Sequence, residues 1–148
     1  MLALSPARRC IMESMSQGQF FDIAALAATL PATAETMLRD IRLTDEAAAS
    51  CRIFRVYRPA PLHFHTACDE YLYVLQGRGR IQIEDTVREV GPGDLIHFKV
   101  RVVHGTPEIL EHPFVFLAID TPRRPLEDVH FVNAADADAS TFIASQGY

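Results

Sequence analysis

The stretch that decides the fold is His-Phe-His-Thr-Ala-Cys-Asp-Glu at residues 63–70. Side chains at positions i and i+2 of an extended strand point to the same face, so we expect His63 and His65 to lie side by side. A short turn can then bring Glu70 opposite them on the next strand, and His104 follows 34 residues later. Imidazole and carboxylate groups are common ligands of divalent transition metals. The predicted metal ligands are therefore His63, His65, Glu70 and His104.

This ligand set predicts the kind of metal but not its identity. Imidazole suits Zn, Cu, Fe and Ni, whereas a carboxylate favours harder ions such as Mn and Fe. We expect one divalent transition metal per chain, drawn from Fe, Mn, Ni, Zn, Co and Cu. Four protein ligands leave a six-coordinate ion two open positions for substrate or oxygen. One carboxylate against a doubly charged ion also leaves a net positive centre, which favours anionic or enolisable ligands.

The pattern of residue types along the chain changes near residue 49. Short β-like segments separated by turn residues follow from there, which is typical of a sandwich or barrel. These segments are residues 51–57, 71–76, 81–84, 87–90, 95–98, 102–105 and 114–119. We therefore predict an all-β fold whose core spans residues 49–120.

The two ends of the chain are expected to pack on this core. Residues 1–48 form a predicted N-terminal extension with helical segments, one through about Met15 and one over residues 20–30 that ends at Pro31. Residues 35–43 fit a strand by their spacing and a helix by their composition. The polar tail, residues 121–148, is expected to wrap the barrel and to dock Phe131 and Phe142.

The histidine block resembles the first sequence motif of the cupins, G-x5-H-x-H-x3–4-E-x6-G. His63, His65, Glu70 and Gly77 fit this motif, and Tyr57 stands in the place of its first glycine. The match is specific because four positions and their spacing agree at once.

The second cupin motif, G-x5-P-x-G-x2-H-x3-N, is matched only in part. Gly93 and His104 are in place. Lys99, Arg101 and Glu108 stand where the motif has proline, glycine and asparagine. The departures affect the turn that precedes His104.

The resemblance covers about residues 51–120. It implies a small antiparallel double-stranded β-helix, the cupin or jelly-roll barrel, with a metal inside one mouth. It also implies a homodimer, which is common in this family. Cupins host many reactions, so the resemblance does not choose between them.

Two further residues are weak catalytic candidates. His97 has a side chain that titrates near neutrality and could serve as an acid or base, although a packed or surface strand position is the expected one. Gln76 is predicted to share the cavity face with Leu72 and Val74 and to contact substrate. Cys68 is expected to be a loop residue that points away from the metal.

Side-chain alternation also predicts residues on other faces. If Glu70 points inward, Tyr71 and Tyr73 point outward and pack under helices or a dimer partner. Arg52 or Arg55 could reach a substrate anion, but we expect each to lie on a solvated edge.

Composition excludes several partners. A chain of 148 residues with 49 % hydrophobic residues has the size and make-up of one globular domain. A net charge of −5 argues against nucleic acid, and no apolar run reaches the roughly 20 residues of a membrane span. Three cysteines without framework spacing and a start unlike a secretory signal predict a reducing, cytoplasmic location.

The expected function is that of a metal-dependent oxidoreductase, dioxygenase-like, acting on a small oxygen-bearing or anionic substrate. A metal-dependent isomerase, decarboxylase or lyase uses the same ligands and remains an alternative. So does a non-catalytic cupin that binds a small ligand or acts as a sensor. A faint helix-turn-helix rhythm in residues 22–42 raises DNA-linked regulation, but this segment is short and lacks a basic recognition helix.

Overall fold

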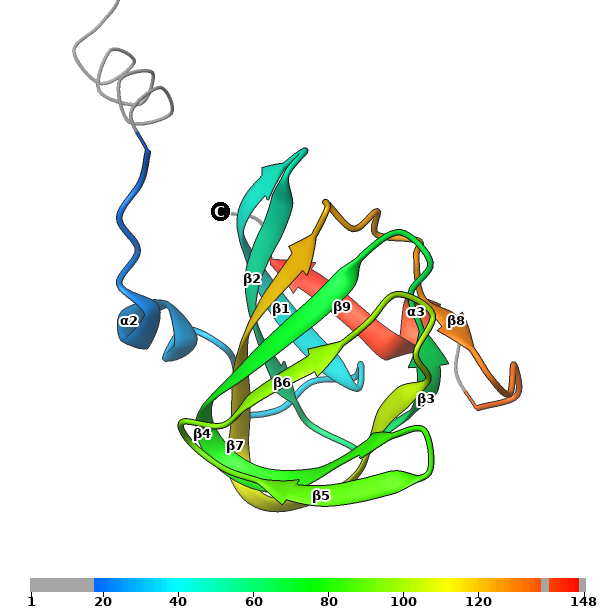
Figure 1. Ribbon diagram of the computed structural model, residues 1–148. Helices are drawn as coiled ribbons and strands as arrows, with labels where there is room; N and C mark the ends of the chain where they lie inside the picture. Colours follow the sequence, from blue (N-terminus) through cyan, green and yellow to red (C-terminus); the bar gives the residue numbers. More distant parts are fainter. Residues whose placement is uncertain (1–17, 137–138, 147–148) are drawn as a thin grey trace, which may run out of the picture.

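The structure is a computed structural model that describes residues 18–136 and 139–146 (Figure 1). The described residues form a nine-stranded sheet and two short helices. The strands are β1 (Leu38–Glu46), β2 (Ala49–Val56), β3 (Ala60–Phe64), β4 (Asp69–Ile83), β5 (Thr86–Val90), β6 (Leu95–Phe98), β7 (His104–Thr121), β8 (His130–Phe131) and β9 (Ile143–Gln146). The helices are α2 (Ile23–Ala27) and α3 (Ala139–Phe142). The predicted all-β architecture is confirmed.

Strands β4 and β7 are long and change partners along their length. The main path of the sheet is β5-β4-β7-β2-β1-β9, while β6 pairs with β4 and β3 pairs with both β7 and β8. The bent strands therefore fold the sheet over on itself and enclose the interior seen in Figure 1.

Two details differ from the predicted antiparallel barrel. Strand β9 runs parallel to β1, so the sheet is mixed. The hydrogen-bonded path also ends at β5 and β9 and does not close into a ring. A strand that returns from the far end of the chain is free of the hairpin constraint that makes sequential neighbours antiparallel.

One end of the interior is a well-packed apolar core. Phe54, Phe114, Phe116 and Val74 are buried there, and the Phe54 and Phe116 rings stack with centroids 5.0 Å apart. Burying each such side chain stabilises the fold by roughly 1.5–3 kcal/mol. This packing holds β2, β4 and β7 in fixed register.

The N-terminal region contributes both a helix and a strand. Helix α2 is shorter than the predicted helix over residues 20–30, and the side chain of Asp22 caps it by accepting the Ala25 N–H at 3.0 Å. Leu30 then packs against Ile53 on the outer face of the sheet. Within residues 35–43, for which strand and helix were both open, residues 38–43 belong to β1, so the strand alternative is confirmed. The predicted helix near Met15 lies outside the described residues.

The C-terminal segment crosses the mouth of the barrel. Strand β8 pairs with β3, and β9 pairs with β1. Phe131 and Phe142 contact the His63 ring with centroid distances of 6.2 and 5.0 Å, so both dock as expected. Within the described residues, no helix is long and apolar enough to cross a membrane.

Candidate metal centre

Three histidines converge inside the barrel mouth. His63 on β3 lies directly opposite His104 at the start of β7, and His65 follows β3 on the same face. One ligating nitrogen from each ring lies within 4.8 Å of the other two. All three side chains are buried. The strand alternation that placed His63 and His65 on one face is therefore confirmed, and the three rings form a cluster that can hold a metal ion.

Backbone carbonyls set the same tautomer in all three rings. The Nδ1 atoms donate to carbonyl oxygens, which only accept, so in the neutral rings Nδ1 carries the proton and Nε2 keeps its lone pair. The distances are 2.8 Å from His63 to Pro61, 2.6 Å from His65 to Asp128 and 2.9 Å from His104 to Val102. Orientation of this kind is typical of histidines that bind metals.

The buried Nε2 atoms of His65 and His104 form no hydrogen bond with the described residues, and the nearest charged group among these is the Glu70 carboxylate. Burial and the two neighbouring histidines also hold the pKa of His63 well below its usual range, so that ring is neutral. A buried lone pair without a partner is costly, and a divalent cation satisfies several at once. The donor set therefore fits a transition metal.

Glu70 at the start of β4 lies beside this cluster. Its Oε1 is 3.4 Å from His104 Nε2 and 3.8 Å from His65 Nε2, while its Oε2 accepts from Arg52 Nη2 at 2.8 Å. Burial opposes ionisation, yet the pKa of Glu70 is held well below its usual range, to which the charge of Arg52 contributes. One carboxylate oxygen thus faces the histidines and the other is held by an arginine.

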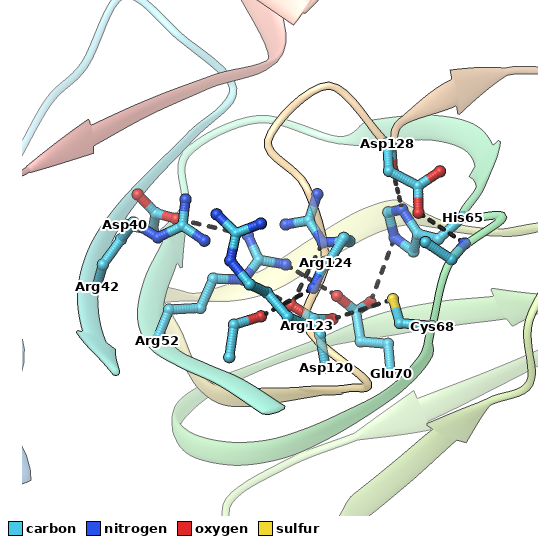
Figure 2. A network of polar contacts seen from close by, with 12 residues as sticks. Asp40, Arg42, Arg52, His65, Cys68, Glu70, Asp120, Arg123, Arg124 and Asp128 are labelled. Carbon is cyan, nitrogen blue, oxygen red and sulfur yellow. Dashed lines mark hydrogen bonds and ion pairs between the residues drawn. The ribbon is translucent and has the colours of Figure 1, made fainter. Parts of the chain in front are cut away.

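Arg52 was expected on a solvated edge, and this expectation is wrong. Its position on β2 gives it the same inward parity as Phe54, and it is buried. Its Nη2 lies 2.8 Å from Glu70 Oε2, its Nη1 lies 3.6 Å from Asp40 Oδ2 and its Nε lies 3.6 Å from Asp120 Oδ2 (Figure 2). Burial opposes its charge, yet the three carboxylates raise its pKa. The shared parity with Phe54 was the sequence signal for this placement.

Asp120 near the end of β7 forms the floor of the site together with Arg124. Asp120 pairs with Glu70 across β7 and β4, and Arg124 Nε donates to Asp120 Oδ2 at 3.3 Å. Burial, and the nearby charge of Glu70, raise the pKa of Asp120, although Arg52 opposes the shift. Neither residue was singled out from the sequence, because charged residues near a strand end usually face solvent.

Cys68 lies in the loop before β4, as expected, and it is buried. Its Sγ lies 3.9 Å from Asp120 Oδ1. Burial and the neighbouring carboxylate raise the pKa of its thiol to about 12, so it stays protonated and is a poor nucleophile or metal ligand at neutral pH.

Asp128 fixes the turn that carries His65. Its carboxylate accepts the backbone N–H groups of Thr66 and Ala67, each at 2.9 Å, and the Thr66 hydroxyl at 2.8 Å. These bonds and His130 lower its pKa to about 2 even though burial opposes the shift. Its backbone carbonyl is the acceptor for His65. The C-terminal segment therefore orients a histidine of the site.

The two weak catalytic candidates do not reach the cluster. His97 is exposed on the outer face, where it stacks on Tyr71 at 4.4 Å and its Nε2 lies 3.0 Å from Asp69. Gln76 is exposed, although Leu72 and Val74 are buried as predicted. The inward position predicted for Gln76 is wrong because the register of β4 against β7 shifts between Val74 and Gln76, which rotates the side chain out.

Arg101 forms the turn before His104 despite departing from the motif. Its φ is 69°, the left-handed conformation that the glycine of the motif adopts freely. Its N–H donates to the His65 carbonyl at 2.7 Å. The turn therefore forms without glycine, and Arg101 adopts a strained left-handed backbone conformation there.

The histidines line a small cavity of about 30 Å³. Phe98 stacks on the His104 ring with centroids 3.9 Å apart, and Phe142 closes the opposite side over His63. Beyond His63, His65, Glu70 and His104, the polar residues that line it are Arg52, Thr106 and Arg124.

Comparison with known proteins identifies the fold family. The model of the cupin domain matches residues 56–120, so this part of the chain is a cupin domain. No curated protein matches the sequence. The match includes all four predicted ligands.

Solved structures agree with this assignment. KdgF from Halomonas sp. is 22 % identical, with 73 % of this chain and 96 % of that chain covered and a TM-score of 0.61. An uncharacterized conserved protein with a double-stranded β-helix domain from Klebsiella pneumoniae is 18 % identical, with coverage of 72 % and 92 % and a TM-score of 0.58. A cupin superfamily protein from Desulfitobacterium hafniense is 17 % identical, with coverage of 71 % and 92 % and a TM-score of 0.54. At these identities the likeness shows the fold alone.

Proposed function

We propose that this cupin is a metal-dependent enzyme that acts on a small anionic or oxygen-bearing substrate. His63, His65 and His104 bind one divalent transition metal through Nε2, and Glu70 is the fourth ligand through Oε1. The observation that carries the proposal is the set of three buried rings whose Nδ1 atoms are all held by carbonyls, while Nε2 of His65 and His104 forms no hydrogen bond with any described residue. The metal is Fe, Mn, Ni, Zn, Co or Cu.

The protein prepares the site through three features. Arg52 keeps Glu70 ionised and fixes its orientation. Phe98 and Phe142 pack on the histidine rings and limit the access of water. When bound, a divalent ion supplies electrophilic stabilisation of substrate oxygens and, if it is iron, the capacity to react with dioxygen.

The lining of the cavity favours oxidative cleavage over isomerisation. Among the described residues, Arg52, Thr106 and Arg124 are the polar lining groups besides the proposed ligands. None of them titrates near neutral pH in a way that suits an acid or base. Isomerases, decarboxylases and lyases usually need such a group, whereas an oxygenase can rely on the metal. A dioxygenase-like oxidoreductase is therefore the leading assignment.

A non-catalytic binding module is the second candidate. The small cavity and the lack of a separate acid or base among its described lining residues both fit retention of a ligand. In that case the same four side chains would hold a metal and a small ligand without turnover.

Oxygen consumption separates these assignments. Protein loaded with Fe(II) under anaerobic conditions is mixed with a panel of small 2-oxo acids, diketones and aromatic acids, and oxygen uptake is followed with an electrode. We expect uptake in the wild type and in His97→Ala, whose side chain is exposed, and none in His104→Ala. No uptake with any metal contradicts the oxygenase, and conversion of a substrate without oxygen supports an isomerase or lyase.

The predicted homodimer also remains a proposal. Tyr73, Leu95 and Ile119 are exposed at 41 %, 64 % and 39 % on the outer face of adjacent strands, which provides an apolar surface for a second copy. Light scattering is expected to give twice the 16.5 kDa chain mass, and Leu95→Lys is expected to give the monomer mass. A monomeric wild type contradicts the proposal.

A further inference from the structure

Two arginines are buried in the cavity and differ sharply in their partners. Arg52 and Arg124 are each 5 % exposed. Arg52 meets three carboxylates, those of Glu70, Asp40 and Asp120. Arg124 meets one, because its Nε donates to Asp120 at 3.3 Å. Within residues 18–136 and 139–146, no group accepts a hydrogen bond from the two terminal nitrogens of Arg124.

This difference leaves the terminal nitrogens of Arg124 without a hydrogen bond to the described residues, on a side chain that is largely buried. A guanidinium offers five N–H donors, and a buried charge is costly unless it is paired and hydrogen-bonded. Burial and the like charge of Arg52 lower the pKa of Arg124, whereas the pKa of Arg52 is raised by its carboxylates. Arg124 therefore has fewer anionic partners than Arg52 and is the better candidate to bind another anion.

Arg124 is also held where it can meet a ligand of the metal centre. Its backbone N–H donates to the Ser50 hydroxyl at 3.2 Å, and its side-chain Nε donates to Asp120 Oδ2. Its side chain lines the same cavity as the three histidines. Figure 2 shows Arg124 next to Asp120 and Glu70 at this floor.

The charges of the cluster favour a single anion. Arg52 and Arg124 face the carboxylates of Asp40, Glu70 and Asp120. A bound divalent cation turns this excess of one negative charge into an excess of one positive charge. One monoanion then neutralises the buried cluster, which lowers the cost of keeping it out of water.

We propose that Arg124 is the anion-binding residue of the cavity and that the substrate class is a small monocarboxylate. The carboxylate accepts from the terminal nitrogens of Arg124, and an oxygen on the neighbouring carbon faces the histidines, as in a 2-oxo acid. This inference rests on the proposed function. The cavity of about 30 Å³ has room for roughly two water molecules, which is less than a 2-oxo acid needs. Binding therefore requires Phe142, which packs over His63, to move.

Matched pairs of charged and neutral ligands test the proposal. Protein loaded with redox-inert Zn(II) is titrated by calorimetry with pyruvate and pyruvamide, and with acetate and acetamide. A hydrogen bond to a charged group strengthens binding by roughly 10- to 100-fold. We therefore expect the wild type to prefer at least one acid over its amide by about that factor, and Arg124→Met to lose the preference.

Three controls keep the outcome specific. Zinc content is measured for each protein, and a full equivalent in Arg124→Met shows that the metal centre is intact. Arg124→Lys keeps the charge but loses the planar pair of donors, so its preference is expected to fall about tenfold; this variant decides the test if Arg124→Met does not fold. Arg123→Met removes an exposed arginine that pairs with Asp45, and it is expected to bind like the wild type.

The result also separates this inference from the proposed function. If the wild type retains zinc but prefers no acid, or if Arg124→Met and Arg124→Lys keep the full preference, the assignment of Arg124 is overturned while the metal centre stands. If the wild type retains no metal, the proposed function fails. Titration of the metal-free protein then decides the anion site, which is supported by an Arg124-dependent preference and overturned without one.

Discussion

The interior of this barrel has two ends that differ in chemistry although the same three strands build both. Phe54, Leu72 and Ala118 mark the start of the apolar end on β2, β4 and β7. Two residues along each strand, the same inward face carries Arg52, Glu70 and Asp120. The cross-strand pairs Glu70 with Asp120 and Leu72 with Ala118 show how abrupt the boundary is.

The difference shows how the fold divides its tasks. The apolar end stabilises the barrel through burial and aromatic packing. Buried charges at the other end contribute little net stability even when paired, because desolvation opposes their attraction. The charged end is therefore explained by what it binds, and the apolar end by the stability that makes such a site possible.

Truncation at the apolar end is expected to have the largest effect on stability. Phe116→Ala removes a fully buried ring and leaves a cavity between Phe54 and Phe114, which costs about 4 kcal/mol of unfolding free energy. Urea denaturation measures this loss. Metal content per folded chain should remain that of the wild type, and a loss of metal at intact stability contradicts the division between the two ends.

Removal of one charge at the other end is expected to cost somewhat less. Arg52→Met leaves Glu70, Asp40 and Asp120 without their shared cation, which destabilises the metal-free protein by about 3 kcal/mol. Denaturation of the chelator-treated protein measures it. Arg80→Met is the control, because its exposed pair with Glu108 is worth about 0–1 kcal/mol. Equal effects of the two substitutions would contradict the role given to burial.

Lowering the pH should remove the stabilisation that Asp128 provides to the turn that orients His65. Its pKa is lowered to about 2 from a usual value near 3.8, so the stabilisation is complete above about pH 4 and is lost as pH falls through about 2. Asp128→Asn is expected to cost about 2 kcal/mol at neutral pH. The gap between wild type and variant, measured by urea denaturation, should close between pH 4 and pH 2. A gap that is independent of pH contradicts this assignment.

The turn at Arg101 is expected to give the smallest effect, and of opposite sign. Arg101→Gly relieves a left-handed backbone at φ 69°, while the freer unfolded chain offsets part of the gain. The expected net stabilisation is about 0.5 kcal/mol, measured by thermal unfolding. Arg101→Ala keeps the β-carbon and should show no such gain. A loss of stability in Arg101→Gly would mean that the arginine side chain has a role of its own.

These two ends also show what the sequence could predict. The i, i+2 spacing was sufficient to place His63 and His65 on one face, because strand alternation is a local property. The convergence of His104 with them was supported by the resemblance to the cupin motifs, because it depends on the pairing of β3 with β7. Arg52 is two residues from Phe54, so strand alternation predicts the same inward face for both, but the charge of Arg52 favoured a solvent-exposed position. Asp120 carried the same signal through its parity with Phe116 and Ala118. Arg124 and Asp128 lie outside the strands and could not be found in this way, because their burial depends on contacts between segments far apart in the chain.

The position of Gln76 shows the limit of alternation itself. A register shift within β4 reverses the parity that holds for Leu72 and Val74, and the adjacent Gly77, at φ 77°, packs where a β-carbon would lie 2.2 Å from the Pro113 carbonyl oxygen. The predicted strand over residues 71–76 ends before Gly77, whereas β4 continues through this bend to Ile83. A glycine inside a strand often marks a bulge, where the alternation of side chains between the two faces is interrupted.

Metal content after replacement of single histidines tests the convergence of the three rings. Protein purified without chelators and reconstituted with one metal at a time is analysed by elemental analysis for the wild type, His65→Ala and His97→Ala. We expect about one equivalent in the wild type and in His97→Ala, whose side chain lies on the outer face, and almost none in His65→Ala. A full equivalent in His65→Ala, or none in the wild type with any of the six metals, would contradict a metal centre at this site.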